Sequence, residues 1–451
     1  MAHRVLVLAK HFPPTGGAGV HRTVGTVRYL ADHGYEPVVV TGPGERVDRW
    51  SPSDPGLLGR IPADVEVHRL EGTEPTGQTG LKGKARNALR VPPSWVPWWI
   101  EGAIEIGTRV GAGADLVLAS GNPYYTADAG AEVARRLGVP WIVDLEDPWA
   151  FDEMRVHPTV MHHRAELRWM RRSLRTVSAV ITCAEEAAVR IRRGLPELSD
   201  RPIVNVPIGF DRDDFPPAEH AERDDGKFRI VHTGTMHTAL GLRHRATRNR
   251  RRLLGGTSVD VDILTRSPVF LLEAVEALIA RDPGLADRIE VHLAGQLTGG
   301  DREVADRYPF VRTPGLLAHA ETVALMRSAD LLFLPMHEMA PGRRAGLVPY
   351  KTYEYLAAER PILAAVPDGD ARDILAGVSH ATLCRPSDVE AMATAIREAV
   401  ARGPVDRVRD GIDSPALARY ERRAAVGEIA DVLDLVLQEA GAPRRSAAVR
   451  R

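Results

Sequence analysis

The sequence repeatedly alternates short apolar runs with segments of helical periodicity, and this pattern constrains its fold more than any other feature. Residues 4–9 (RVLVLA) and 37–41 (PVVVT) are continuous apolar runs of strand length. Residues 20–33 lie between them and place apolar side chains at helical spacing. Further apolar runs of strand length lie at residues 116–119, 141–143, 179–182 and 203–206. Because such continuous runs are typical of parallel strands that helices cover on both faces, the pattern predicts a doubly wound α/β domain over residues 1–207.

The alternation stops once and then restarts, which predicts two domains. Residues 211–226 (DRDDFPPAEHAERDDG) are charged and contain two adjacent prolines. Such a composition buries little surface, so we predict a linker over residues 208–227. The strand and helix patterns then resume and predict a second Rossmann-like domain over residues 228–410. We expect a helix over residues 411–440 to return toward the first domain, and residues 441–451 to form a disordered basic tail.

Composition excludes several classes of protein. The net charge of −1 gives no basis for binding nucleic acid. The sequence has no run of about 18 or more apolar residues, and polar residues directly follow its first apolar run, so we expect neither a transmembrane helix nor a signal peptide. Cys183 and Cys384 have no CxxC partner. We therefore expect buried structural thiols in a reducing cytoplasm, and no metal site.

A glycine-rich segment, residues 12–21 (FPPTGGAGVH), connects the first predicted strand to the first predicted helix. Gly16 and Gly17 would let the backbone approach a ligand, and the helix N-terminus would offer N–H groups to an anion. The second strand ends in Val40–Thr41–Gly42, without the acidic residue that holds the ribose of NAD. These features disfavour a dehydrogenase and favour a sugar-nucleotide phosphate. The alternative is a plain tight turn.

Three carboxylates follow the strand predicted at residues 141–143. Asp144, Glu146 and Asp147 lie in the segment VPWIVDLEDPW, at the strand end where open α/β sheets bind ligands. They could orient an acceptor hydroxyl or act as a base. The alternative is that they cap helices and hold loops by hydrogen bonds.

A charged pair opens the helix predicted over residues 351–358. Glu354 could accept hydrogen bonds from the two hydroxyls of a ribose, and Lys351, three residues earlier on the same helical face, could contact a phosphate. The alternative is an ordinary exposed glutamate and lysine.

Two further segments leave their interpretation open. Residues 243–252 (RHRATRNRRR) interrupt a strand-to-helix connection, and form either an anion-binding loop or flap, or a solvated insertion. Residues 92–99 (PPSWVPWW) follow the basic stretch 82–90. These tryptophans suit either a peripheral membrane contact or a bulky apolar acceptor, or else burial against the first domain.

Four segments, in this order along the chain, resemble motifs of the retaining glycosyltransferases of family 4. They are HFPPTGGAGVHRT (11–23), ASGNPYYTADAGAEVARRLGVPWIVDLEDPW (119–149), NVPIGFDRDDF (205–215) and VPYKTYEYLAAERPILA (348–364). That family has the GT-B fold, so the resemblance implies an α/β protein with two Rossmann-like domains facing across a cleft. It also implies transfer of a sugar from a nucleotide diphosphate sugar, with retention of anomeric configuration and without a metal or other cofactor.

The residues that match these motifs acquire expected roles. Donor contacts are expected from Gly16, Gly17, Thr235, Arg266, Pro314, Gly315, Leu316, Lys351, Thr352 and Glu354, with Glu354 on the ribose. Acceptor contacts are expected from His21, Asp144 and Trp149. Catalytic roles are expected for Glu146, Asp147, Arg266 and Lys351, the last two by stabilising the departing diphosphate.

Three positions depart from the family's motifs. Gly346 stands where the first glutamate of an E-x7-E motif is expected, Glu146 stands in place of an arginine, and Ile208 stands in place of an asparagine. The first departure bears on donor handling and the second on the geometry of the acceptor or base.

The sequence therefore predicts a cytoplasmic glycosyltransferase. Its C-terminal domain would bind the nucleotide sugar, and its N-terminal domain would bind a sugar, natural-product or lipid-linked acceptor. Two alternatives stay open. One is a sugar-nucleotide epimerase or phosphorylase on the same fold. The other is a non-catalytic GT-B protein that assists another transferase, which Gly346 and the basic insertion would explain.

Overall fold

The computed structural model describes residues 2–44, 52–76, 92–216, 223, 225–403, 408 and 410–441. The chain divides into two compact units. The N-unit comprises Met1–Asp152, Met161–Pro207 and Arg423–Arg451, and the C-unit comprises Glu153–Val160 and Ile208–Arg422. The basic stretch 82–90, most of residues 217–224 and the predicted tail from residue 442 onward lie outside the described residues.

The N-unit contains a parallel sheet in the order β3-β2-β1-β4-β5-β6-β7. Its strands are β1 (His3–Ala9), β2 (Tyr35–Thr41), β3 (Glu66–Arg69), β4 (Leu116–Ser120), β5 (Trp141–Glu146), β6 (Ala179–Thr182) and β7 (Ile203–Asn205). Its helices are α1 (Ala18–Tyr29), α3 (Trp95–Val110), α4 (Thr126–Leu137), α5 (Val160–Ser173), α6 (Glu185–Gly194) and α14 (Arg422–Glu439). The order reverses between β1 and β4, as in a doubly wound domain.

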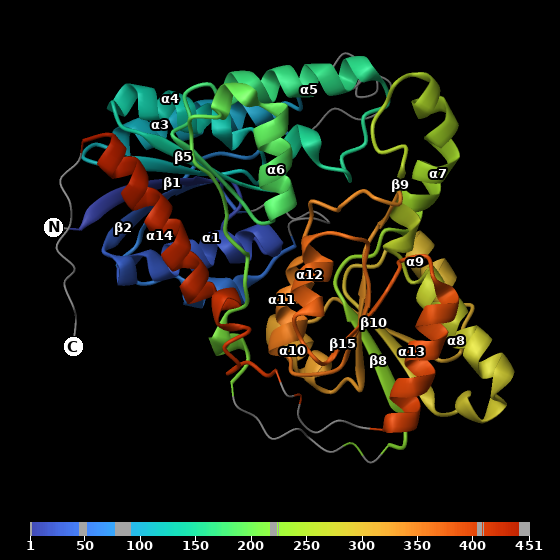
Figure 1. Cartoon of the computed structure of the whole chain (residues 1–451). Helices are drawn as coiled ribbons and strands as arrows, with labels where there is room; N and C mark the ends of the chain where they lie inside the picture. The colour runs from blue at the N-terminus through green and yellow to red at the C-terminus, as the bar shows by residue number, and fades with distance from the viewer. Residues whose placement is uncertain are drawn as a thin grey trace. The chain divides into compact units, whose positions relative to one another are not determined.

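Helices cover both faces of this sheet (Figure 1). On one face, α1 and α14 pack against β1 and β2 through apolar side chains such as Val24, Val426 and Leu433. On the other face, α3, α4, α5 and α6 enclose a second core that includes Trp99 and Ile191. Because the strands are buried on both faces, their sequences are continuous apolar runs.

The C-unit contains a second parallel sheet, in the order β11-β10-β8-β12-β14-β15. Its strands are β8 (Phe228–Thr233), β10 (Ile289–Ala294), β11 (Val311–Gly315), β12 (Leu331–Pro335), β14 (Ile362–Ala365) and β15 (Ala381–Cys384). Its helices are α7 (Thr238–Leu253), α8 (Val269–Arg281), α9 (Gly299–Ala305), α10 (His319–Arg327), α11 (Tyr350–Ala357), α12 (Asp370–Ala376) and α13 (Val389–Arg402). The prediction of two doubly wound sheets is confirmed.

The arginine-rich insertion is a helix, which corrects the prediction of a loop or flap. It forms α7, and the chain then returns through β9 (Val261–Asp262), which pairs antiparallel with β13 (Glu338–Met339). Arginine has a high helix propensity and residues 238–253 contain no proline, so the local sequence favours this outcome. Residues 208–216 lie within the predicted linker, but they bury more apolar surface than their charge suggests. Phe210 and Phe215 are both buried in the C-unit.

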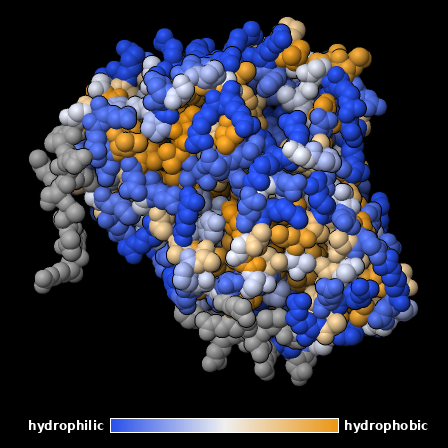
Figure 2. All heavy atoms as spheres, viewed as in Figure 1, coloured by the Kyte–Doolittle hydropathy of each residue, from blue (hydrophilic) through white to orange (hydrophobic). Residues whose placement is uncertain are grey.

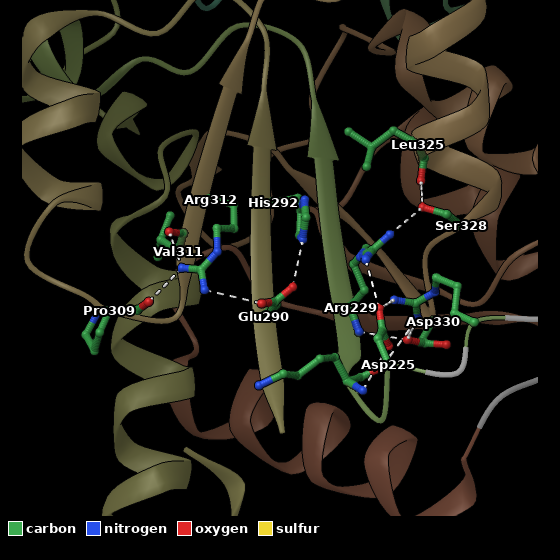
Figure 3. A network of polar contacts seen from close by, with 12 residues as sticks. Asp225, Arg229, Glu290, His292, Pro309, Val311, Arg312, Leu325, Ser328 and Asp330 are labelled. Carbon is green, nitrogen blue, oxygen red and sulfur yellow. Dashed lines mark hydrogen bonds and ion pairs between the residues drawn. The ribbon is translucent and has the colours of Figure 1, made fainter. Parts of the chain in front are cut away.

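Ion pairs join neighbouring strands at the amino ends of the C-unit sheet (Figure 3). On β8, Arg229 contacts Asp225 at 3.1 Å, and its backbone N–H donates to Asp330, which precedes β12, at 2.7 Å. Glu290 on β10 contacts Arg312 on β11 at 3.3 Å. This network lies at the end of the sheet opposite to the carboxyl ends, where ligands bind in such folds. We therefore assign it to the fold.

The two cysteines are as the composition predicts. Both Cys183 and Cys384 are free and buried. In the part of the chain that is described, no helix combines the length and the apolar character needed to cross a bilayer.

Candidate active site

The strand order of the C-unit indicates where a ligand can bind. In open parallel sheets, ligands bind beyond the carboxyl ends of the strands, where the strand order reverses. In this sheet the reversal lies between β8 and β12. The residues that follow these strands, Gly234 and Thr235 after β8 and Met336 and His337 after β12, therefore border the candidate site.

Three glycines leave the carboxyl ends of β8, β10 and β11 without side chains. Gly234, Gly295 and Gly315 have φ of 124°, 133° and 83°, a region that L side chains rarely adopt. Their backbones are joined, because Gly234 N–H donates to Ala294 O and Gly295 N–H donates to Gly315 O, both at 2.8 Å. A Cβ on Gly295 would overlap Gly234 O. A ligand can therefore approach the backbone closely here.

Two cations act at this edge: Lys351 lies beside Gly234, and Arg266 acts on the nearby His232. The Lys351 Cε lies 3.3 Å from the place where a Cβ on Gly234 would be. His232, at the end of β8, is buried, and burial lowers its pKa to about 4, with further lowering by Lys351 and Arg266. Its Nδ1 lies 3.0 Å from Phe333 O, and its Nε2 has no hydrogen-bond partner among the described residues. The site thus combines a neutral imidazole with two positive charges, which suits an anion.

Lys351 and Glu354 form an ion pair on α11. Lys351 Nζ lies 2.6 Å from Glu354 Oε2, and the Glu354 side chain is only 1% exposed. Glu354 is therefore not the ordinary exposed glutamate of the alternative interpretation. Thr352 on the same helix is fully buried, and its Oγ1 has no hydrogen-bond partner among the described residues. Its donor contact stays a prediction.

The other predicted donor residues of the C-unit lie around the same edge. Thr235 and Arg266 are half-buried, and Arg266 O accepts a hydrogen bond from His237 N–H at 2.9 Å just before α7 begins. Pro314 is exposed beside Gly315 at the end of β11, and Leu316 is 59% exposed. The structure brings these residues to one edge of one sheet.

Glu153 belongs to this edge, although the sequence analysis did not identify it. Its Oε1 accepts a hydrogen bond from Gly346 N–H at 2.9 Å and lies 3.1 Å from His337 Nε2. His337 is fully buried and the Glu153 side chain is 4% exposed. Gly346 is the position where the family motif has its first glutamate, so a carboxylate from elsewhere in the chain is bound there. No local pattern could reveal this contact, because 193 residues separate its partners.

In the N-unit, the loop after β1 leads into α1. Gly17 is the N-cap of α1 and has φ of 110°, and no side chain caps this helix. Gly16 N–H instead donates to Pro52 O at 2.6 Å, and a Cβ on Gly16 would lie 2.8 Å from Asp54 Cβ. Gly16 therefore packs against a neighbouring loop. Its amide is already used there, and its role as a donor contact stays a prediction, as does that of Gly17.

Asp144 forms a buried ion pair with Arg22 of α1. Arg22 Nε donates to Asp144 Oδ2 at 2.6 Å, and Arg22 also donates to the carbonyls of Val206 and Pro207 at 3.1 Å each. The arrangement ties α1 to β5 and to the chain after β7. The ion pair occupies Asp144 Oδ2, whereas Oδ1 has no hydrogen-bond partner among the described residues, so its acceptor contact stays a prediction. His21, the neighbour of Arg22 on α1, is half-buried.

Glu146 combines an unusual backbone with a perturbed carboxyl group. Its φ is 60°, a strained value for a residue with a side chain. A Cβ on Gly19 would lie 2.9 Å from Glu146 Oε1 and would overlap Asn122 Nδ2, so these two side chains converge over the first turn of α1. Burial raises the pKa of Glu146 to about 8, with a further increase from Asp144 and Asp147 and an opposing effect of Arg22. Such a carboxyl group is suited to proton transfer near neutral pH.

The tryptophans that the sequence analysis singled out belong to the core of the N-unit. Trp149 is fully buried, stacks on Tyr124 at 5.1 Å and donates to Glu166 at 2.8 Å. It has no exposed surface with which to contact an acceptor, which corrects that prediction. Trp99 is also fully buried, and Trp95 and Trp98 pack against the same core. Of the two interpretations of residues 92–99, the structure bears out burial.

Comparisons with known proteins match both units. A model of the glycosyl transferase 4-like domain matches residues 16–209, and a model of glycosyl transferases group 1 matches residues 265–402. The D-inositol 3-phosphate glycosyltransferase of Geodermatophilus obscurus is 30% identical over 178 residues. That alignment covers 35% of this chain and 36% of the relative, so the chain spans about a third of the length of that protein.

Solved structures share the fold over nearly the whole chain. Anabaena HepE, solved with UDP and glucose, aligns with a TM-score of 0.52 at 15% identity, over 97% of this chain and 98% of its own. Sucrose-phosphate synthase from Thermosynechococcus elongatus aligns with a TM-score of 0.57 at 14% identity, over 97% of both chains. At this identity the likeness concerns the fold. Together with the two family models, it shows that the chain belongs to the GT-B glycosyltransferases of group 1, with a glycosyl transferase 4-like domain in its N-terminal part.

Proposed function

We propose that the protein transfers a sugar from a nucleotide diphosphate sugar to an acceptor hydroxyl, with retention of anomeric configuration. The observation that carries this proposal is the edge of the C-unit sheet where glycines expose the backbone beside Lys351 and Arg266. A diphosphate suits both features, because the missing side chains let it approach the strand ends closely and its charge needs cations.

The donor would lie along this edge with its diphosphate at the glycines. Lys351 would leave its ion pair with Glu354 and contact a phosphate oxygen, and Glu354 would then accept hydrogen bonds from the ribose hydroxyls. The exposed Leu316 side chain offers an apolar surface for the base. Arg266 and Lys351 would stabilise the diphosphate as it departs, which is the main electrostatic demand of this reaction.

The acceptor would be handled by the N-unit. Asp147 and His21 are candidates for orienting it, and Glu146, whose pKa is raised to about 8, is the candidate for receiving its proton. A curated relative is named for D-inositol 3-phosphate, which makes phosphorylated polyols the first class of acceptor to test. Natural products and lipid-linked sugars follow. We also propose a cytoplasmic location, which fits two buried free thiols.

Calorimetric titration of nucleoside diphosphates tests the donor site. UDP is the first ligand to use, because solved GT-B structures contain it. We expect wild type to bind one diphosphate, and Glu354→Gln to lose about 1–3 kcal/mol of binding free energy, the usual range for a charged hydrogen-bond partner. Glu390→Gln is the matched control, since Glu390 pairs with Arg281 at 2.6 Å on exposed α8 and α13. If no diphosphate binds at millimolar concentration, the proposal fails.

Product analysis separates transfer from the alternatives. A transferase consumes donor and forms a new glycoside only when the acceptor is present. An epimerase would convert the donor without acceptor, and a phosphorylase would need phosphate. A non-catalytic partner protein, which Gly346 at the motif position favours, would bind donor without turnover.

A further inference from the structure

The helix α7 presents two exposed leucines on one line between two rows of arginines. Leu242 and Leu253 are eleven residues apart, about three turns, and therefore lie on one line along the helix. Ala246 and Asn249 lie between them on the same line. At about 100° per residue, Arg243 and Arg250 flank this line on one side and Arg245 and Arg252 flank it on the other. We call these eight residues the α7 face.

The α7 face points away from the body of the C-unit. The opposite side of the helix is packed, because Gly241, His244 and Arg251 are buried and a Cβ on Gly241 would overlap Leu264. The two leucines of the α7 face are exposed, with 53% of Leu242 and 85% of Leu253 accessible to solvent. Large apolar side chains exposed to this degree in a row are unusual on a protein surface.

The apolar surface continues past the end of the helix. Leu254 is 40% exposed and Val160 is 38% exposed. Val160 N–H donates to Leu254 O at 3.0 Å, so these two residues are adjacent. Figure 2 shows hydrophobic atoms among hydrophilic ones in the region where Figure 1 draws α7.

The charge of the helix is entirely positive. Residues 238–253 contain six arginines and no acidic residue. Arg245 pairs with Asp262 and Arg252 with Asp260, at 2.5 and 3.6 Å. Within the described part of the chain, Arg243, Arg248 and Arg250 form no ion pair.

We propose that the α7 face docks on an anionic lipid bilayer. An interfacial helix combines an apolar stripe, which enters the boundary between headgroups and acyl chains, with flanking basic residues, which contact lipid phosphates. Arginine reaches phosphates while its stem covers apolar surface. A nucleic acid would use the arginines, but its charged backbone would give the exposed leucines no apolar environment.

Cosedimentation of the full-length protein with vesicles tests this proposal. We expect binding to vesicles of phosphatidylglycerol and phosphatidylcholine, weak binding to phosphatidylcholine alone, and weakening by added salt. Arg243→Glu/Arg250→Glu should lower the partition coefficient about tenfold or more, because four units of charge change at the surface. Leu253→Asp should also weaken binding, and since Leu253 is exposed the variant should fold normally.

A charge control on another helix tests whether vesicle binding depends on the α7 face. Arg397→Glu/Arg402→Glu makes the same charge change on the exposed side of α13 and should bind vesicles like wild type. The proposal is overturned if anionic and neutral vesicles bind equally, or if the α13 control loses as much as the α7 variant. It is also overturned if Leu253→Asp has no effect while a DNA duplex competes with the vesicles, since the arginines would then act as a general polyanion site. No donor or acceptor is needed, so the result is independent of the proposed transfer reaction.

Discussion

Glu146 shows how the environment of one residue changes the chemistry available to it. The sequence places three carboxylates within four positions, and the structure gives them different roles. Asp144 is neutralised by Arg22, whereas Glu146 stands on a strained backbone and has a pKa raised to about 8. A buried carboxyl group whose pKa is raised in this way is a candidate acid or base.

If Glu146 is the base, kcat/KM of wild type should rise as pH increases through about 8, because the carboxylate must be ionised to accept a proton. Glu146→Gln should lower kcat/KM about 100-fold or more and abolish this rise. The raised pKa also favours the folded state below the ordinary value of 4.5 and ceases to do so as pH increases through about 8. A pH profile of both proteins checks this, and an unchanged profile in the variant would remove Glu146 from the mechanism.

Glu153 allows a second prediction at the scale of one residue. Glu153→Ala leaves Gly346 N–H and His337 Nε2 without this acceptor, which should cost about 1–3 kcal/mol of unfolding free energy. Glu153→Gln keeps an oxygen that can accept from Gly346 N–H, so it should lower the free energy of unfolding by less. Urea denaturation measures the free energy of unfolding of both variants. Equal losses would show that this acceptor oxygen does not stabilise the fold.

At the scale of elements, the ends of three strands make the candidate donor site. Glycines follow β8 and β10 and end β11, and hydrogen bonds from Gly234 to Ala294 and from Gly295 to Gly315 join these strand ends. A side chain on any of them would need an uncommon backbone conformation, and at Gly295 it would also meet the neighbouring strand end. The sequence analysis found Gly315 through the family resemblance, whereas Gly234 and Gly295 became apparent only when their strands were adjacent.

Gly295→Ala should destabilise the protein by about 1–3 kcal/mol, because φ is 133° there and the new Cβ would overlap Gly234 O. It should also weaken nucleotide binding, since the strand ends must separate. Gly299→Ala is a suitable control, as no atom lies within 4 Å of its Cβ position. Thermal unfolding measures the stability of both variants, and calorimetry measures their nucleotide affinity. If Gly295→Ala and Gly299→Ala lose the same stability and affinity, Gly295 is not needed to keep the strand ends together.

At the scale of the whole molecule, both units share one architecture, and in each the candidate residues gather at the carboxyl edge of the sheet. If the nucleotide binds only the folded protein, a nucleoside diphosphate at 100 times its Kd should add about 2.7 kcal/mol to the free energy of unfolding. Differential scanning calorimetry with and without UDP measures the accompanying rise in Tm. Glu354→Gln at the same UDP concentration should show a smaller rise, and an equal rise would move the nucleotide away from α11.

The sequence by itself determined the two doubly wound sheets, because apolar runs and helical periodicity are local consequences of strands and helices buried on defined faces. It also singled out Lys351, Glu354 and Glu146 as candidates, since each lies in a short contiguous segment, and their roles stay predictions. Only the tertiary structure revealed that Trp149 and Thr352 are buried, that Asp144 is bound by Arg22, and that Glu153 reaches Gly346. These facts depend on contacts between residues far apart in the chain. No local pattern records such contacts, because packing brings them together only after the elements have formed.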